Sequence, residues 1–313
     1  MTQVIPTFLL GGAPKSGTTA IANYLREHPA IFFSRTKEPF YWASDMPAMR
    51  QAARVDTEEA YLRLFADAKP EHIAVGEGTT LYLYSDCAIR DALQWNPNFK
   101  FVFMLRRPEV VAHAYHMQMK FHEFEDIEDF QEAWEAQEQR RMDPSSIPSR
   151  CREPRLLQYG KVASVGSQLE RAMAQIAPEN RLVLLFDDFT ADTRGTYLRV
   201  LDFLGVKDDG RTDFPQENAA MVAKHAGLTR MMRMPAVVAA TDYLKRHLKG
   251  GPYALARSAK HSLMLKSSPR TPLDNRFQLE LLEWFVPEVE LVESLLERDL
   301  SAWKKPIVKK PKT

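Results

Sequence analysis

A short glycine-rich segment near the N-terminus constrains the fold of this 313-residue chain more than any other feature. Residues 8–19 read FLLGGAPKSGTT, an apolar run followed by glycines, one lysine and three hydroxyl side chains. Glycine lets successive backbone N–H groups converge on an anion, and a helix that begins near Thr18 directs its positive end to the same point. The segment therefore predicts a phosphate-binding turn between a strand and a helix.

The position of the lysine separates this loop from that of common nucleotide hydrolases. In a Walker A loop, GxxxxGK[ST], the lysine follows the second glycine. Gly12, Gly17 and Thr19 fit that frame, but Thr18 stands at the lysine position and Lys15 lies three residues earlier. An ordinary ATPase or GTPase would thus lack its main cation here.

Residues 14–19 resemble the P-K-[ST]-G-T-T loop of sulfotransferases that use 3′-phosphoadenosine 5′-phosphosulfate (PAPS), in particular the bacterial branch of that family. The resemblance implies that Lys15 stabilises the charge on the departing phosphate oxygen. It also implies that five residues of the loop bind the 5′-phosphosulfate: Lys15, Ser16, Gly17, Thr18 and Thr19.

Residues 37–42, KEPFYW, resemble the Lys-Glu-Pro-aromatic element of the Golgi heparan-sulfate-type sulfotransferases and their bacterial relatives. In those enzymes the glutamate is assigned as the base that deprotonates the acceptor, which makes Glu38 the candidate base and Lys37 a candidate acceptor contact. A hydroxyl has a pKa far above neutral, so a positioned carboxylate must take its proton during attack. We expect Pro39 and the aromatic residues at 40–42 to hold this carboxylate against an apolar wall; a surface glutamate before a turn is the alternative.

Residues 101–108, FVFMLRRP, read as a buried strand that ends in two arginines, with a proline suited to the first turn of a helix. They resemble the 3′-phosphate element of the family, L-R-x-P-x-x-R-x-x-S, in which Arg106 matches the arginine that grips the phosphate. Val111 and Ala114 stand where that element has a second arginine and a serine. Either other groups hold the 3′-phosphate or the donor binds more weakly than in the family.

The family closes a late basic loop over the nucleotide. Lys266 and Arg270, in the sequence KSSPR, are the candidates for that loop and for binding the donor. Arg107 is the alternative cation.

Residues 75–84, VGEGTTLYLY, match the strand and loop after which these enzymes place their acceptor-binding edge. Glu77 and Tyr82 are candidate substrate residues. Glu77 could be a second acid or base, could orient Lys15, or could be a structural carboxylate. Gly78 replaces the lysine found at this place in heparan-type enzymes, which argues against a heavily anionic acceptor.

Two histidines compete with Glu38 for the role of base. Cytosolic aryl and steroid sulfotransferases use a histidine, and His113 and His116 lie one helical turn apart after Arg106. They are therefore kept as alternatives.

Short apolar runs alternate with amphipathic segments, the pattern of an α/β protein with a P-loop-like parallel sheet covered by helices on both faces. We expect one domain over residues 1–313, with cap or lid insertions around 117–158 and 219–275. The predicted strands are 6–11, 73–76, 100–105 and 181–186. The predicted helices are 17–28, 86–94, 108–120, 127–141, 161–176, 192–204 and 276–297.

Composition restricts partners and location. The 42 basic and 41 acidic side chains give a net charge of +1, which favours neither nucleic acid nor an anionic membrane surface. No apolar run reaches 18 residues, so we expect no transmembrane helix. Cys87 and Cys151 lack metal-ligand spacing, as do the histidines and acids, and two cysteines suit a reducing compartment. We expect a cytoplasmic protein that needs no metal.

The sequence thus favours a PAPS-dependent sulfotransferase acting on a small-molecule, lipid or glycan acceptor, and it specifies neither that acceptor nor the oligomeric state. Two alternatives stay open. A P-loop nucleotide or sugar kinase would share the first strand and loop. A non-catalytic protein that binds adenosine 3′,5′-bisphosphate (PAP) would explain Val111 and Ala114.

Overall fold

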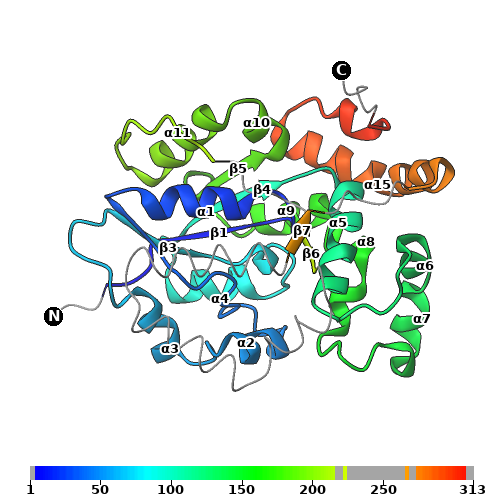
Figure 1. Cartoon of the computed structure of the whole chain (residues 1–313). Helices are drawn as coiled ribbons and strands as arrows, with labels where there is room; N and C mark the ends of the chain where they lie inside the picture. The colour runs from blue at the N-terminus through cyan, green and yellow to red at the C-terminus, as the bar shows by residue number, and fades with distance from the viewer. Residues whose placement is uncertain (1–3, 216–220, 224–264, 268–272, 308–313) are drawn as a thin grey trace. The chain divides into compact units, whose positions relative to one another are not determined.

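The computed structural model describes residues 4–215, 221–223, 265–267 and 273–307 (Figure 1). Five parallel strands form one sheet in the order β2-β3-β1-β4-β5, which confirms the predicted α/β class. The strands are β1 (Phe8–Gly12), β2 (Ile31–Phe33), β3 (Ala74–Gly78), β4 (Lys100–Leu105) and β5 (Arg181–Leu185).

The central strand is buried on both faces. Phe8 and Leu10 pack into one apolar cluster and Leu9 into the other, because successive side chains of a strand point to opposite faces. All five residues of β1 are buried, as is usual for a parallel sheet enclosed between layers of helices.

Helices cover both faces (Figure 1). The helices that contribute to the cluster of Phe8 and Leu10 are α1 (Thr18–Glu27), α10 (Phe186–Ala191) and α11 (Thr193–Leu204). Those that contribute to the cluster of Leu9 are α4 (Ala88–Trp95), α5 (Pro108–Phe121), α8 (Tyr159–Ala163), α9 (Val165–Met173) and α15 (Asn275–Leu296).

Short helices and turns make up the connections. The short α-helices are α2 (Pro47–Ala53), α3 (Glu58–Leu62), α6 (Phe130–Glu135) and α7 (Gln137–Met142). The 3-10 turns are η1 (Arg63–Phe65), η2 (Thr80–Tyr82), η3 (Pro144–Ser146), η4 (Pro154–Leu157), η5 (Pro178–Asn180) and η6 (Ser301–Lys304).

The structure corrects several predicted elements. The predicted helix 127–141 consists of α6 and α7, and 161–176 consists of α8 and α9, which are separated at Ser164 by a residue with ψ 67°. The strand β2 and the helices α2 and α3 were not predicted, since seven residues or fewer give little periodicity. The other predicted elements end within about two residues of the observed bounds.

The chain divides into two compact units, residues 1–217 with 273–313 and residues 218–272. In the second unit β6 (Met221–Ala223) pairs antiparallel with β7 (Leu265–Ser267), and Lys266 lies opposite Val222. The single domain with insertions around 117–158 and 219–275 stays a prediction. Among the described residues no helix is both long and apolar enough to cross a membrane.

Candidate active site

The carboxyl ends of three neighbouring strands meet at one edge of the sheet. Leu10 of β1 pairs with Gly78 of β3, and Gly12 of β1 pairs with Met104 of β4. The glycine-rich loop, the turn η2 and Arg106 directly follow these three strands. Ligands of open parallel sheets bind at this edge, so the structure brings together segments that lie up to about ninety residues apart in sequence.

The loop after β1 has the backbone that an anion site requires. Gly12 has φ 129°, and a Cβ there would lie 2.1 Å from the carbonyl oxygen of Met104. Gly17, with φ 91°, caps α1, and Lys15 also adopts a left-handed conformation with φ 63°. No side chain caps the helix and no acidic residue stands in its first turn. The N–H groups at the start of α1 therefore suit a negatively charged ligand.

The hydroxyls of the loop differ in their exposure. Ser16 is fully buried, and its Oγ donates to the carbonyl oxygen of Ala13 at 2.5 Å, so it braces the loop from within. Thr18 is 3 % exposed, whereas Thr19 is exposed and Lys15 is half-buried. Of the three hydroxyls, that of Thr19 is the most accessible to a bound phosphosulfate.

Arg106 is tied to the same loop. Its Nη1 donates to the carbonyl oxygen of Lys15 at 2.8 Å, and its guanidinium lies 4.0 Å from the ring centroid of Phe186. Val111 and Ala114, which replace the second arginine and the serine of the 3′-phosphate element, are 0 % and 3 % exposed. They belong to the core, so Arg106 is the described candidate for that phosphate.

The alternative cations are less suited to the donor. Arg107 donates to the carbonyl oxygen of Trp303 at 3.2 Å and forms an ion pair with Glu109 at 2.7 Å, so it holds the C-terminal turn η6. Lys266 is described only as part of β7, and Arg270 lies outside the described residues.

Glu38 stands in a turn that is bound to the end of β3. Its backbone N–H donates to the carbonyl oxygen of Gly78 at 2.8 Å, and its carboxylate accepts from the N–H of Thr80 at 2.9 Å and from the Thr80 hydroxyl at 3.2 Å. Lys37 forms an ion pair with it, and its side chain is 31 % exposed. The expected apolar wall is wrong, because polar donors surround this carboxylate.

The turn that carries Glu38 has an uncommon backbone. Glu38 and Phe40 have φ of 60° and 56°, which is rare outside glycine and is kept where surrounding contacts enforce it. The enforcing contacts come from residues 78–80. That segment also lies beside β1, since a Cβ on Gly11 would be 3.6 Å from the carbonyl oxygen of Thr79.

Two of the predicted acceptor residues are buried. Tyr82 is 1 % exposed and its hydroxyl accepts from the N–H of Trp42 at 3.5 Å, so the structure places it in the core instead of on a binding surface. Glu77 is fully buried in β3. Burial raises its pKa to about 8, and the neighbouring charge of Glu38 acts in the same direction.

The two histidines of α5 have packing contacts. His116 is 2 % exposed, its Nε2 lies 3.0 Å from the carbonyl oxygen of Ile127, and burial lowers its pKa. The ring of His113 stacks on Phe130 with centroids 5.0 Å apart. These contacts favour structural roles and leave Glu38 as the candidate base.

Sequence reasoning missed the part played by Thr79 and Thr80. Their hydroxyls and N–H groups hold the turn of residues 38–40, although they lie about forty positions further along the chain. The only signal was their place directly after a strand at the ligand-binding edge.

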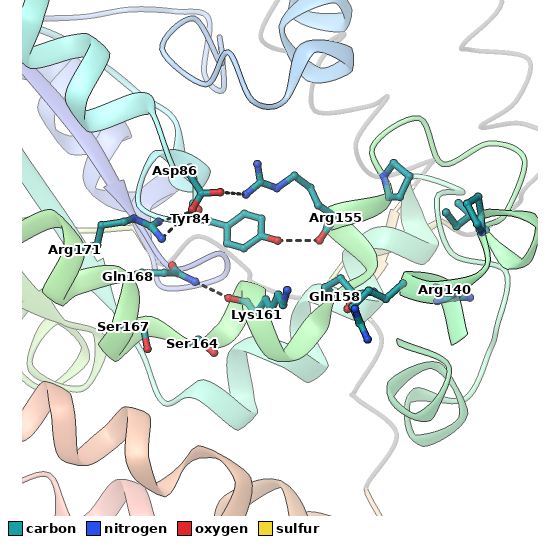
Figure 2. A pocket seen from close by; sticks show the side chains of 14 residues that line it. Tyr84, Asp86, Arg140, Arg155, Gln158, Lys161, Ser164, Ser167, Gln168 and Arg171 are labelled. Carbon is teal, nitrogen blue, oxygen red and sulfur yellow. Dashed lines mark hydrogen bonds and ion pairs between the residues drawn. The ribbon is translucent and has the colours of Figure 1, made fainter. Parts of the chain in front are cut away.

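A pocket of about 720 Å³ lies elsewhere, between η4, α7, α8 and α9 (Figure 2). Its five cationic side chains are Arg140, Arg141, Arg155, Lys161 and Arg171. Four of the five bind acids of the protein, and Asp86 alone pairs with both Arg155 and Arg171. None of the predicted site residues lines this pocket, and it is not assigned to the reaction.

The sulfotransferase domain family matches residues 6–245, so the chain belongs to that family. The kinase interpretation is therefore dropped. Among curated proteins none matches the chain by sequence.

Solved structures show the same fold. The sulfotransferase from Alicyclobacillus acidocaldarius is 24 % identical with a TM-score of 0.70, over 96 % of this chain and 100 % of the other. The sulfotransferase domain from the curacin biosynthetic pathway is 13 % identical with a TM-score of 0.44, over 96 % and 100 %. Mouse sulfotransferase SULT7A1, complexed with PAP, is 14 % identical with a TM-score of 0.42, over 65 % and 60 %.

Proposed function

We propose that the protein transfers the sulfuryl group of PAPS to a hydroxyl or amine of a small-molecule, lipid or carbohydrate acceptor and releases PAP. One observation carries the proposal. In a member of the sulfotransferase family, the loop of Lys15, the guanidinium of Arg106 and the Thr80-bound carboxylate of Glu38 all follow strands at one edge of the sheet.

At the donor end, the protein must neutralise the charge that builds on the phosphate oxygen as its bond to sulfur breaks. Lys15 and the N–H groups at the start of α1 supply a preorganised positive potential at the loop. Such electrostatic stabilisation is the main protein contribution in the analogous phosphoryl transfers. Because a lysine can supply this charge, we expect transfer to continue in the presence of EDTA.

At the acceptor end, Glu38 takes the proton of the attacking hydroxyl or amine while the new bond to sulfur forms. Its carboxylate is partly exposed, so an acceptor can reach it, and Thr80 and Lys37 hold its orientation. The electron pair of the broken sulfur–oxygen bond leaves on PAP, and the proton stays on Glu38 until solvent removes it.

The direct experiment incubates the purified chain with PAPS labelled in its sulfuryl group and a panel of hydroxyl and amine acceptors. The proposal predicts equal amounts of PAP released and of label in the acceptor. Binding of PAP with no transfer to any acceptor would support the non-catalytic alternative instead.

The remaining features are proposals from the resemblance alone. They are a cytoplasmic location, no nucleic-acid partner, and closure of Lys266 and Arg270 over the nucleotide. The last predicts that saturating PAP protects residues 219–275 from limited proteolysis and that Lys266→Ala abolishes the protection.

A further inference from the structure

Glu77 is a buried carboxyl group that the proposed mechanism does not use. It is fully buried in β3, directly opposite Leu9 of the central strand. Its Oε2 accepts from the Thr79 hydroxyl at 3.3 Å, and its Oε1 has no hydrogen-bond partner among the described residues. A buried carboxylate with so few donors is costly, so burial favours the neutral acid.

The charged and titratable groups around Glu77 do not offset that cost. Tyr61 of α3 and Tyr82 of η2 are themselves buried phenols. Glu38 repels a second negative charge, and the ammonium of Lys37 is engaged with Glu38. With Glu38 ionised, the surroundings keep Glu77 protonated at neutral pH, with its pKa raised to about 8 chiefly by burial.

A chain of hydrogen bonds leads from Glu77 to the turn of the candidate base. The Thr79 hydroxyl donates to Glu77 and accepts from the N–H of Phe40 at 3.3 Å. Phe40 is one of the two residues of that turn with positive φ, and the other is Glu38 itself. A backbone of this kind persists only where neighbours enforce it.

We propose that Glu77 is a positioning residue, a neutral carboxylic acid that fixes the Thr79 hydroxyl and through it the turn of residues 38–40. This inference rests on the proposed function, because it assigns the turn its purpose of holding Glu38 ready for proton transfer. It requires an acceptor oxygen at position 77 and requires that no negative charge stand there.

Three variants separate these requirements. Glu77→Leu removes the acceptor oxygen, Thr79→Val removes the linking hydroxyl, and Glu77→Gln keeps a neutral acceptor. We expect the first two to lower kcat about tenfold, the equivalent of one lost hydrogen bond, with the KM for PAPS unchanged. We expect Glu77→Gln and Thr79→Ser to restore most of that loss.

Two readouts do not depend on an acceptor. Hydrogen exchange of the amides of residues 38–42 should be faster in Thr79→Val and Glu77→Leu than in the wild type, and unchanged in Glu77→Gln. Infrared difference spectra of the wild type between pH 6 and pH 9 should show a carboxylic acid band that Glu77→Gln lacks.

The outcomes are distinct. If Glu77→Gln is as impaired as Glu77→Leu, or if Thr79→Val is unaffected in exchange and kcat, the positioning role is wrong. If Glu77→Leu fails to fold, Thr79→Val and the infrared band still decide the matter. If the wild type transfers no sulfuryl group, the proposed function fails, whereas the exchange and infrared results still determine the state of Glu77 and its hold on the turn.

Discussion

Two buried glutamates of this chain show how surroundings assign different tasks to one residue type. Glu125, between α5 and α6, accepts two hydrogen bonds from Arg140 at 2.6 and 2.7 Å and one from the Tyr159 hydroxyl at 2.5 Å. The N–H groups of Asp126 and Ile127 donate to it as well, both at 2.9 Å. Glu77 has a single donor, the Thr79 hydroxyl.

The two carboxyls consequently differ in charge. Burial opposes ionisation of Glu125, but its hydrogen bonds from Arg140 and Tyr159 outweigh burial and lower its pKa. Burial raises the pKa of Glu77 to about 8. The first carboxylate braces the helices beside the sheet, and the second is a neutral group beneath the candidate base. A fully satisfied buried charge thus marks structure, whereas an unsatisfied one at the ligand-binding edge marks function.

The largest effect on activity should come from the carboxylate that Glu77 supports. Glu38→Gln removes the base, and we expect kcat to fall by about 10²–10⁴-fold with PAP binding retained. Glu71→Gln is the matched control, because Glu71 also pairs with a nearby lysine but precedes β3, at the opposite edge of the sheet. Steady-state rates that fall equally in both variants would contradict the role of Glu38.

The largest effect on stability should come from the other region. Arg140→Ala leaves Glu125 charged, buried and without its main partner, and we expect a loss of about 3–5 kcal/mol in the free energy of unfolding. Urea denaturation measures it. At a temperature where the variant is folded, its kcat should match that of the wild type; a catalytic defect in the folded variant would blur the distinction between the two regions.

Lys15→Ala should affect the chemistry without affecting the fold. We expect the rate to fall by on the order of 10²–10³-fold, as when a preorganised oxyanion donor is lost. Unfolding midpoints should stay within a degree or two of the wild type, since Lys15 is only half-buried. Lys69→Ala, at the opposite edge of the sheet, should behave like the wild type in both measurements.

The two glutamates should give opposite pH dependences of stability. Folding raises the pKa of Glu77, so its contribution falls as pH rises from about 4.5 to about 8, and Glu77→Gln should gain up to a few kcal/mol over the wild type across that window. Folding lowers the pKa of Glu125, so its contribution is present above about 4.5 and is lost as pH falls further.

Denaturation of Glu77→Gln and Glu125→Gln at several pH values tests these signs against the wild type. Parallel curves for Glu77→Gln and the wild type between pH 5 and pH 8.5 would mean that Glu77 does not titrate in that window.

Much of this arrangement could be predicted from the sequence, because it depends on local patterns. The apolar runs predicted four of the five strands, and Lys15 and Arg106 directly follow two of them. Parallel strands present their carboxyl ends at one edge, so the meeting of these residues follows from the fold class.

What could not be predicted depends on contacts between distant segments. The hydrogen bonds of Thr80 to Glu38 join residues 42 positions apart, and the positive φ of Glu38 and Phe40 has no sequence signal in non-glycine residues. The apolar surroundings expected for Glu38 belong instead to Glu77, a distinction that depends on which side chain β3 turns into the core.

Calorimetric titration with PAP, in parallel with 5′-AMP and with ATP without metal, tests the central claim most directly. The account predicts micromolar binding of PAP that requires the 3′-phosphate and weakens about 10- to 100-fold in Arg106→Ala, the value of a charged hydrogen bond. Binding of ATP tighter than that of PAP, or no preference for the 3′-phosphate, would contradict it.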